Sequence, residues 1–354
     1  MANKVTGRTD TTGALTTIPI APKSLIIVGT ATGQTTKTAK TIFTISGTAD
    51  ATAAFGGTIA SEIVKVLISN GVDNIKGIIV PSGDTGLEDA LEATLADKTI
   101  KVILCLDNST DTITAVKDHL TIAESNDKFR YSVFAPSSDS TADQDSLAGF
   151  AKTVASNRIF IPGPSLLKSN GTANADPQVV AAGLASAIMT ETGDPALPMN
   201  GVQLMGFGGT SRILLDAEMK ALASAGITAL YADGTTPTIY RLVTSAVGTD
   251  GTADPVWQEG TTRFIADYVL ENNSELLRAN YKRTKNVARI LESIKDDIKI
   301  NMSKMEAAEI IENWDPNTLT VIKDPDDNYG ALVDYEFDVV TPLYTITINQ
   351  HLKL

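Results

Sequence analysis

The chain has 354 residues, of which 43% are hydrophobic and 20% are charged, and its formal net charge is −13. This composition excludes an intrinsically disordered chain, and the negative charge argues against a general nucleic-acid binder, which presents a broad basic surface. No stretch approaches the roughly 18–20 unbroken apolar residues of a membrane span, and the N-terminus lacks the apolar region of a secretory signal. We therefore expect a soluble protein with a sizeable core, no nucleic-acid partner and no membrane insertion.

Few side chains in the sequence are suited to catalysis or metal binding. Cys105 is the single cysteine, which excludes a disulfide framework and a cysteine-based zinc site. The two histidines, His119 and His351, have no nucleophile-elbow sequence near them, so we expect both to lie at the surface. We predict no catalytic triad, no metal and no other cofactor.

The N-terminal half of the chain begins with an arm and continues as an alternation of strands and helices. Residues 1–22 carry almost no periodic apolar signal, and their apolar side chains include Leu15, Ile18 and Ile20. Short apolar, β-branched runs then predict strands at 24–29, 41–46, 76–80, 101–106, 130–135, 158–161, 228–232 and 238–243. Helical spacing predicts helices at 58–70, 86–96, 112–125, 144–155, 179–190 and 214–225. This order predicts an α/β core domain over 23–245, with a mainly parallel sheet covered by helices on both faces.

The character of the sequence changes after residue 245. Residues 246–262 are rich in Gly, Asp and Pro, which is typical of a loop or boundary. Residues 264–314 are charge-dense and helical in pattern, and Ser303–Glu306 resembles a capping box that opens a helix through Trp314. From Glu306 to Asp338, ten carboxylates stand against one lysine, and we expect an acidic loop at 315–338. The predicted C-terminal domain spans 246–342.

The last twelve residues, 343–354, show the clearest two-residue alternation in the chain. The apolar residues on one face include Tyr344, Ile346, Ile348 and Leu352, whereas the other face is polar. A strand with one apolar face pairs either within its own sheet or with an edge strand of another copy. The pattern alone does not decide between these alternatives.

A basic segment interrupts the acidic chain at residues 278–304, where eight cations stand against three carboxylates. If this segment is one helix, four cations form a single stripe at spacings of four, three and four residues. The four are Arg278, Lys282, Lys285 and Arg289. The alternatives are a solvated helix face and a docking surface for an acidic partner, and Thr284 and Asn286 leave a helix break open.

Three further features of the sequence have some of the residues of a chemical site. Gly29–Gly33 follows a predicted strand but lacks the Gly-Lys-Ser/Thr of a phosphate loop, and Gly206–Ser211 indicates a plain turn before a helix. The carboxylates Asp107, Asp139 and Asp233 follow predicted strands, where open α/β sheets place ligands. Acidic residues are common in such turns, so these positions give only a weak indication of a site.

Several short motifs occur in a characteristic order along residues 24–278. They are Phe55–Ala60, Arg158–Gly163, Asp194–Leu204 (DPALPMNGVQL), Leu222–Thr228, Ile239–Thr244 (IYRLVT) and Gly251–Trp257 (GTADPVW). In this order they resemble the landmarks of the contractile tail sheath proteins of phages, R-type bacteriocins and related contractile injection systems. The resemblance fades after residue 278, and the chain lacks the large insertions of longer sheath proteins.

The resemblance implies a particular fold and architecture. It implies a subtilisin-like core without a proteolytic triad, a smaller α+β C-terminal domain that faces the inner tail tube, and extended terminal arms. The arms match residues 1–22 and 343–354, and they would pair as strands with neighbouring copies. The four-residue basic stripe would then contact the tube.

The resemblance also implies a function without enzymatic activity. The subunits would stack as hexameric rings around the tube, then contract and drive the tube through a target envelope, with genome ejection in a phage. The implied partners are further copies of the chain, the tube protein, and baseplate and tail terminator proteins. The implied location is the sheath of a virion or phage-tail-like particle assembled in the host bacterial cytoplasm. A soluble α/β enzyme or ligand-binding module remains the alternative.

Overall fold

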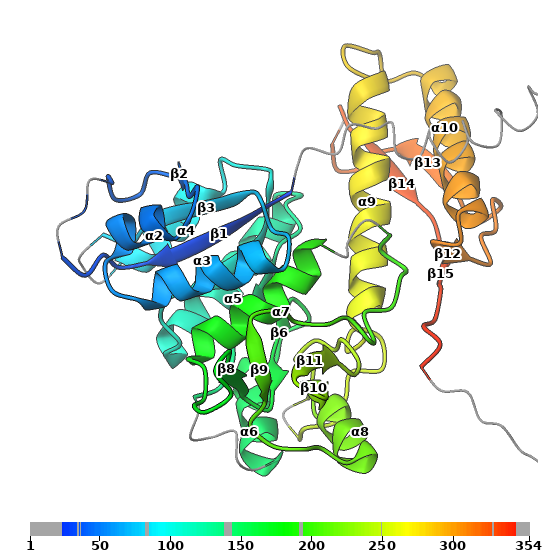
Figure 1. Ribbon diagram of the computed structural model, residues 1–354. Coiled ribbons are helices and arrows are strands. Elements are labelled where there is room, and N and C mark those ends of the chain that lie inside the picture. The colour runs from blue at the N-terminus through cyan, green and yellow to red at the C-terminus, as the bar shows by residue number, and fades with distance from the viewer. Residues whose placement is uncertain are drawn as a thin grey trace, which may run out of the picture. The chain divides into compact units, whose positions relative to one another are not determined.

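The computed structural model describes residues 23–344, apart from 34, 36, 82–84, 138–143, 191–193, 249, 328 and the side chain of 233. The described residues divide into two compact units (Figure 1). The sheet unit comprises residues 23–193, 197–261 and 341–344, and the hairpin unit comprises 194–196 and 262–340. The division falls at Thr262 and not at the predicted residue 246, because 246–261 form backbone bonds with the sheet unit.

A six-stranded sheet organises the sheet unit, in the order β2-β3-β1-β4-β5-β6. Its strands are β1 (Ser24–Gly29), β2 (Phe43–Thr44), β3 (Ile75–Ile79), β4 (Ile100–Cys105), β5 (Tyr131–Val133) and β6 (Ile159–Phe160). Only the short edge strand β2 runs antiparallel to its neighbour, and the other four pairs are parallel. The expected mainly parallel sheet is therefore confirmed.

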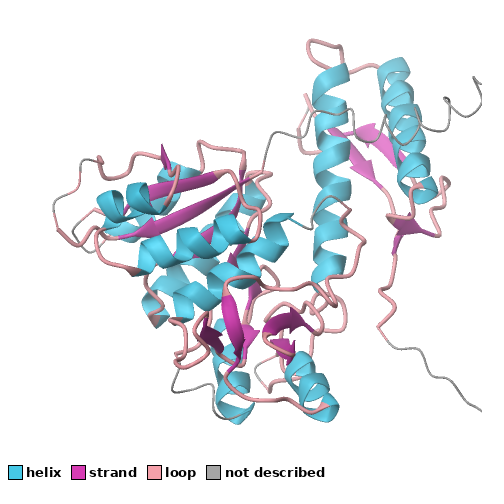
Figure 2. Ribbon diagram, in the orientation of Figure 1, coloured by secondary structure: helices cyan, strands magenta, loops and turns pink. Residues whose placement is uncertain are grey.

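Helices of the sheet unit lie on both sides of this sheet, and α8 lies beside β10 (Figure 2); seven are described in this unit. They are α2 (Thr48–Phe55), α3 (Ile59–Ser69), α4 (Gly86–Thr94), α5 (Thr110–Ser125), α6 (Gln144–Val154), α7 (Pro177–Thr190) and α8 (Asp216–Ser224). Side chains alternate along β1, so Ile26 and Val28 pack with α4, α5 and α6, while Leu25 and Ile27 point the other way. Helices α3 and α7 pack together, and α7 contacts β4 and β5. Both faces of the sheet are thus covered, which explains why the parallel strands read as continuous apolar runs.

Smaller sheets extend the unit beyond β6. Strand β10 (Thr228–Asp233) pairs with β7 (Pro162–Gly163) and β11 (Thr236–Ile239), and β8 (Leu166–Lys168) pairs with β9 (Phe207–Thr210). After β11 the chain continues into a short ladder in which Val243 bridges Glu259 and Thr244 bridges Phe160 of β6. Residues 241–245 and 258–260 therefore attach to the β6 edge of the central sheet, and we call them the edge ladder.

The hairpin unit is built on two long helices, α9 (Gly260–Asn280) and α10 (Ala288–Ala307). They run antiparallel, because Asn301 Nδ2 donates to Asn273 Oδ1 at 2.7 Å and the Tyr281 hydroxyl donates to Asp297 at 2.8 Å. Their buried faces form a second core, which also contains Trp314. No described helix of either unit has the length and apolarity needed to cross a membrane.

Two predictions for this region are wrong. The helix predicted from Ser303 through Trp314 ends at Ala307, and Ser303 lies inside α10. Glu309 and Asn313 adopt positive φ angles of 59° and 51°, which a continuing helix does not allow, and Glu306 accepts a hydrogen bond from the Trp314 backbone at 3.0 Å. The segment predicted as an acidic loop contains paired strands, β13 (Thr320–Lys323) with β14 (Ala331–Asp334), while β12 (Ile311–Glu312) pairs with β15 (Asp338–Val339).

Candidate functional site

Tyr344 is the last described residue, and its side chain is held by two residues of the edge ladder. Its hydroxyl donates to Glu259 Oε1 at 2.6 Å, and the Arg241 guanidinium lies 4.9 Å from its ring centroid. Arg241 and Glu259 form an ion pair at 2.7 Å, in which the Glu259 side chain is 12% exposed. Burial and the nearby Glu259 carboxylate raise the pKa of Tyr344 above its usual range. We call this trio the arm anchor, because residues 345–354 follow it directly.

The residues next to Arg241 and Glu259 in the edge ladder are buried and hydrogen-bonded. Leu242 and Val243, which follow Arg241, are fully buried, and Thr244 N donates to Gln258 O at 2.8 Å. Gly260 packs so closely that a Cβ there would lie 2.9 Å from Leu242 and 3.0 Å from Phe160 of β6. A larger residue at 260 would therefore push the edge ladder away from the central sheet.

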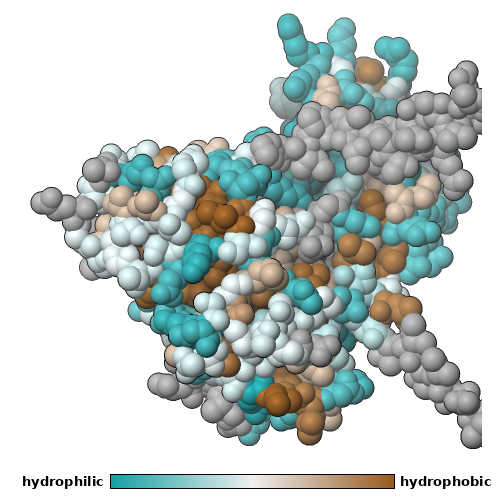
Figure 3. All heavy atoms as spheres, viewed as in Figure 1, coloured by the Kyte–Doolittle hydropathy of each residue, from teal (hydrophilic) through white to brown (hydrophobic). Residues whose placement is uncertain are grey.

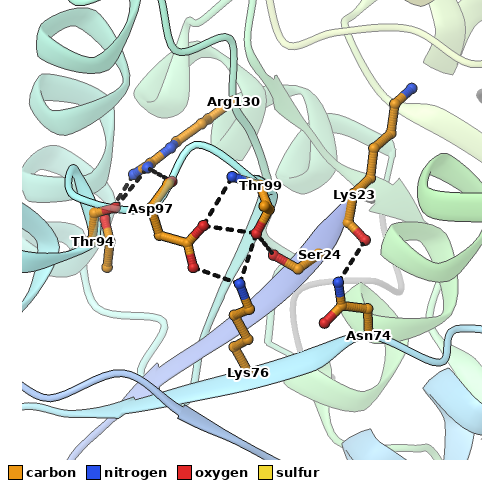
Figure 4. Close-up of polar contacts among 8 residues, drawn as sticks. All are labelled: Lys23, Ser24, Asn74, Lys76, Thr94, Asp97, Thr99 and Arg130. Atoms are coloured by element: carbon orange, nitrogen blue, oxygen red, sulfur yellow. Dashed lines mark hydrogen bonds and ion pairs between the residues drawn. The ribbon is translucent and has the colours of Figure 1, made fainter. Parts of the chain in front are cut away.

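The other end of the described chain is also anchored in the sheet unit (Figure 4). The Lys23 carbonyl accepts from Asn74 Nδ2 at 3.2 Å, and the hydroxyls of Ser24 and Thr99 lie 2.8 Å apart. Lys76 Nζ donates to Thr99 at 2.7 Å and to Asp97 at 2.5 Å. Burial acts to raise the pKa of Asp97, but the bonds from Lys76 and Thr99 outweigh it and leave that pKa lowered. The root of residues 1–22 is thus fixed at the amino ends of β1 and β3.

Two buried arginines, which directly precede β5 and β6, extend this polar network. Arg130 donates to the carbonyls of Thr94 and Asp97 at 2.7 and 2.9 Å, and Arg158 forms a 2.7 Å ion pair with Glu124. Arg130 also donates to His119 Nε2 at 3.0 Å, which requires that nitrogen to be unprotonated. Burial, and then the charge of Arg130, lower the pKa of His119 to about 4. His119 is 4% exposed, so the prediction of a surface histidine is wrong and its role is structural.

The predicted basic stripe is broken into two helices and a loop. Arg278 lies in the last turn of α9, Lys282 and Lys285 lie in the connection 281–287, and Arg289 lies in the first turn of α10. Helix α9 ends at Asn280, and in the connection that follows Arg283 adopts a positive φ of 63°, which a continuous helix does not allow. The single-helix stripe is therefore wrong, although all four side chains and that of Arg283 are exposed at the tip of one hairpin. This basic tip lies in hydrophilic surface at the top of the view in Figure 3.

The hairpin unit contains short, exposed sheets. Among the described residues, the β13–β14 sheet has two strands, and six of their eight residues are exposed. On its outer face, the cross-strand partners Ile322 and Leu332 are 50% and 46% exposed. A two-stranded ribbon has marginal stability by itself and offers backbone donors and acceptors at both edges. It can therefore accept a further strand.

The candidate carboxylates and glycine-rich loops have structural roles where the structure describes them. Asp107 accepts hydrogen bonds from Ser109 and Thr112 at the start of α5. Burial acts to raise the pKa of Asp107, but these bonds outweigh it. Gly206 has a positive φ in the turn before β9, and the Gly29–Gly33 loop is held where Thr32 N donates to Phe55 O at 2.7 Å.

A pocket of about 630 Å³ lies between α4 and α5. His119 contributes to its lining, together with apolar residues and four exposed carboxylates: Glu88, Glu92, Asp111 and Asp118. The Thr114 hydroxyl also lines the pocket, and it donates a hydrogen bond to the Thr110 carbonyl one turn earlier in α5. Within the described ranges, no group of three or more His, Cys, Asp and Glu residues is placed to hold a metal ion.

Several predicted residues lie outside the described part of the chain. They are Leu15, Ile18 and Ile20 of the N-terminal arm, Ile346, Ile348 and Leu352 of the C-terminal arm, and also Asp139 and His351. The Asp233 side chain is likewise outside it. Sequence reasoning missed Arg241 and Glu259, although Arg241 is the arginine of the IYRLVT motif.

Comparison with known proteins finds no family model that matches the chain and no matching curated protein. The structure, however, matches solved structures over nearly its whole length. A chain of the anti-feeding prophage baseplate gives a TM-score of 0.71 at 14% identity, over 94% of this chain and 95% of that chain. The anti-feeding prophage helical sheath in its contracted state gives 0.71 at 16% identity, over 94% and 93%. This chain has the fold of contractile sheath proteins.

A third match supports the same conclusion. A sheath tail protein from Listeria innocua gives a TM-score of 0.69 at 10% identity, over 94% of this chain and 96% of that chain. Because each match covers both chains almost completely, the sheath fold accounts for the sheet unit and the hairpin unit together. The resemblance seen in the sequence motifs is confirmed at the level of the fold.

Proposed function

We propose that the chain is the structural subunit of a contractile tail sheath. The observation that carries the proposal is the match to sheath structures over 94% of the chain. In this proposal the subunits form hexameric rings that stack around an inner tube, and the sheath contracts to drive the tube through a target envelope. The same proposal includes a subtilisin-like core and, in a phage, genome ejection. It also includes contacts with tube, baseplate and terminator proteins.

The proposed means of assembly is strand exchange between copies. Residues 345–354 alternate between apolar and polar side chains, and they follow directly on the arm anchor. Within the described residues no third strand pairs with the β13–β14 ribbon, so a strand from a neighbouring copy would pair with one of its edges. A contact of this heterologous kind repeats from copy to copy and builds an open tube.

The proposed mechanism of contraction is a change of lattice between two states. Main-chain bonds between arms and neighbours persist while the subunits rotate as rigid bodies. A free-energy difference of only ~2–5 kcal/mol per subunit would sum to a large force over many subunits. The basic tip would hold the extended state on the tube through exposed ion pairs, which contribute only ~0–1 kcal/mol each and so release readily.

Electron microscopy of the purified protein tests this function. The proposal predicts rings or hollow cylinders, whereas a soluble enzyme or binding module would give compact single particles at every concentration. Esterase, protease and nucleotide-binding assays test the alternative directly. Saturable activity that is lost on substitution of Asp107 or Asp139 would favour the enzyme.

A further inference from the structure

The two ends of the described chain attach to the same sheet. Ser24, at the root of residues 1–22, is the first residue of β1. Tyr344, at the root of residues 345–354, is bonded to the edge ladder, which bridges β6. In the order of the sheet, only β4 and β5 separate β1 from β6.

The strands between the two roots are tightly connected. The pairs β1–β4, β4–β5 and β5–β6 are all parallel ladders, and the Ser132 hydroxyl of β5 donates to the Ile103 carbonyl of β4 at 2.8 Å. Ser245 N of the edge ladder donates to the Ile159 carbonyl of β6 at 2.9 Å. The side chains of Ile103 and Ile159 are fully buried. This part of the sheet is therefore stiff in comparison with its exposed surroundings.

The chain between the hairpin unit and Tyr344 is held much less firmly. Residues 340–343 belong to no described helix or strand, and Leu343 is 69% exposed. No side-chain hydrogen bond of these four residues is found within the described part of the chain. Tyr344 is thus the first residue after β15 whose side chain is bonded to a packed element.

We propose that Tyr344, with Arg241 and Glu259, is the anchor through which the C-terminal arm transmits tension. Tension that a neighbouring copy applies to residues 345–354 passes through Tyr344 into the edge ladder. It then crosses β6, β5, β4 and β1 to the root of the N-terminal arm, and it bypasses residues 262–340. The inference rests on the proposed function, since it requires that arms join neighbouring copies.

The geometry of the trio suits this role. The Arg241–Glu259 ion pair fixes both partners before Tyr344 binds, so the ring meets a preorganised site. The tyrosine contributes a hydrogen bond to a charged acceptor through its hydroxyl and a cation–π contact through its ring. By contrast, Tyr329 is 94% exposed and provides a matched tyrosine that lacks such a site.

The test uses the full chain with single substitutions at the two tyrosines. Tyr344→Ala should lower the urea midpoint for sleeve dissociation and reduce the sleeve yield by about tenfold, with Tyr344→Phe intermediate, because the phenylalanine keeps only the ring contact. Tyr329→Ala and Tyr329→Phe should behave like the wild type. Circular dichroism of the dissociated chains should give the same unfolding midpoint for all variants.

A double-mutant cycle provides a second measurement that does not depend on Tyr344→Ala being folded. Tyr344→Phe and Glu259→Ala should each lower the dissociation midpoint, and the double variant should lower it by less than the sum of the two single effects, because both substitutions remove the same hydrogen bond. Equal yields and dissociation midpoints for Tyr344→Ala and Tyr329→Ala, or fully additive effects in the cycle, would overturn the anchor. Deletion of residues 345–354 separates the two proposals. Normal sleeves from the deletion variant would contradict the proposed function of the arm. Loss of sleeves in the deletion variant, together with normal sleeves in the Tyr344 variants, would contradict the anchor alone.

Discussion

The hydroxyl of Tyr344 donates a 2.6 Å hydrogen bond to Glu259, a residue 85 positions earlier in the chain. Ionisation of this tyrosine would remove the donated proton and place a second negative charge beside the Glu259 carboxylate. Burial of the ring opposes ionisation as well, and both effects raise the pKa of Tyr344.

This relationship predicts a specific result in an alkaline titration. Tyr344→Phe should follow the same tyrosinate absorbance curve as the wild type up to about pH 11, because Tyr344 stays protonated there in the folded protein. In denaturant, the two curves should differ by one of the chain's eight tyrosines. A difference of one tyrosine in the folded proteins near pH 10 would show that the bond to Glu259 does not form.

The His119–Arg130 contact predicts a pH dependence of folding stability. The pKa of His119 is lowered to about 4 in the folded protein, so between pH 6.5 and 4 the unfolded chain binds more protons at this residue. Stability is therefore fully present above pH 6.5 and is lost as the pH falls towards 4, by up to about 3 kcal/mol. His119→Gln keeps an acceptor for Arg130 but has no titrating group. Urea unfolding at pH 7 and pH 4.5 should show a smaller loss for this variant, and equal losses would contradict the assignment.

Cys105 should be unreactive in the folded protein. Its side chain is 6% exposed, and burial together with the Asp107 carboxylate raises the pKa of the thiol to about 12. Thiolate is the reactive form, so a disulfide reagent at pH 8 should modify the thiol only after unfolding. Rapid modification of the native protein would show that β4 is open to solvent at this position.

The basic tip predicts a selective assembly defect. Reversal of Lys282, Lys285 and Arg289 to glutamate should prevent assembly on an inner tube but spare tube-free contracted sleeves, because only the tube contact depends on these charges. A control that reverses Lys65, Lys98 and Lys152, which are exposed on the sheet unit, keeps the same charge change. Extended sleeves of normal yield in the tip variant would show that the tip is ordinary solvated surface.

The α/β core could be predicted from the sequence because its signals are local. Continuous apolar strands such as Ser24–Gly29, and helices with apolar spacing such as Ile59–Ser69, lie within two residues of their predicted bounds. Both signals reflect burial, which the two-faced sheet makes nearly complete. The short strands β13 and β14 were missed, since they are largely exposed and joined by an acidic turn.

Long-range partners could not be predicted in the same way. The connection 281–287 interrupts a segment whose composition favours a helix, and Arg283 has a positive φ within it; the four stripe cations therefore lie on three elements. The arm anchor joins Arg241 and Glu259 with Tyr344, and in the sequence the residues of the hairpin unit, 262–340, lie between them. No sequence pattern links residues that are so far apart. The helical sequence around His119 predicts a surface residue, and only the structure shows that Arg130 lies beside it.

Copies of this chain should join through their arms into a hollow sheath. Electron microscopy of the full chain and of a variant without residues 345–354, at equal high concentration, distinguishes sheaths from single particles. We expect hollow cylinders from the full chain and compact single particles, with an unchanged unfolding curve, from the variant. Compact single particles from the full chain, or cylinders from the variant, would rule out assembly through the arms.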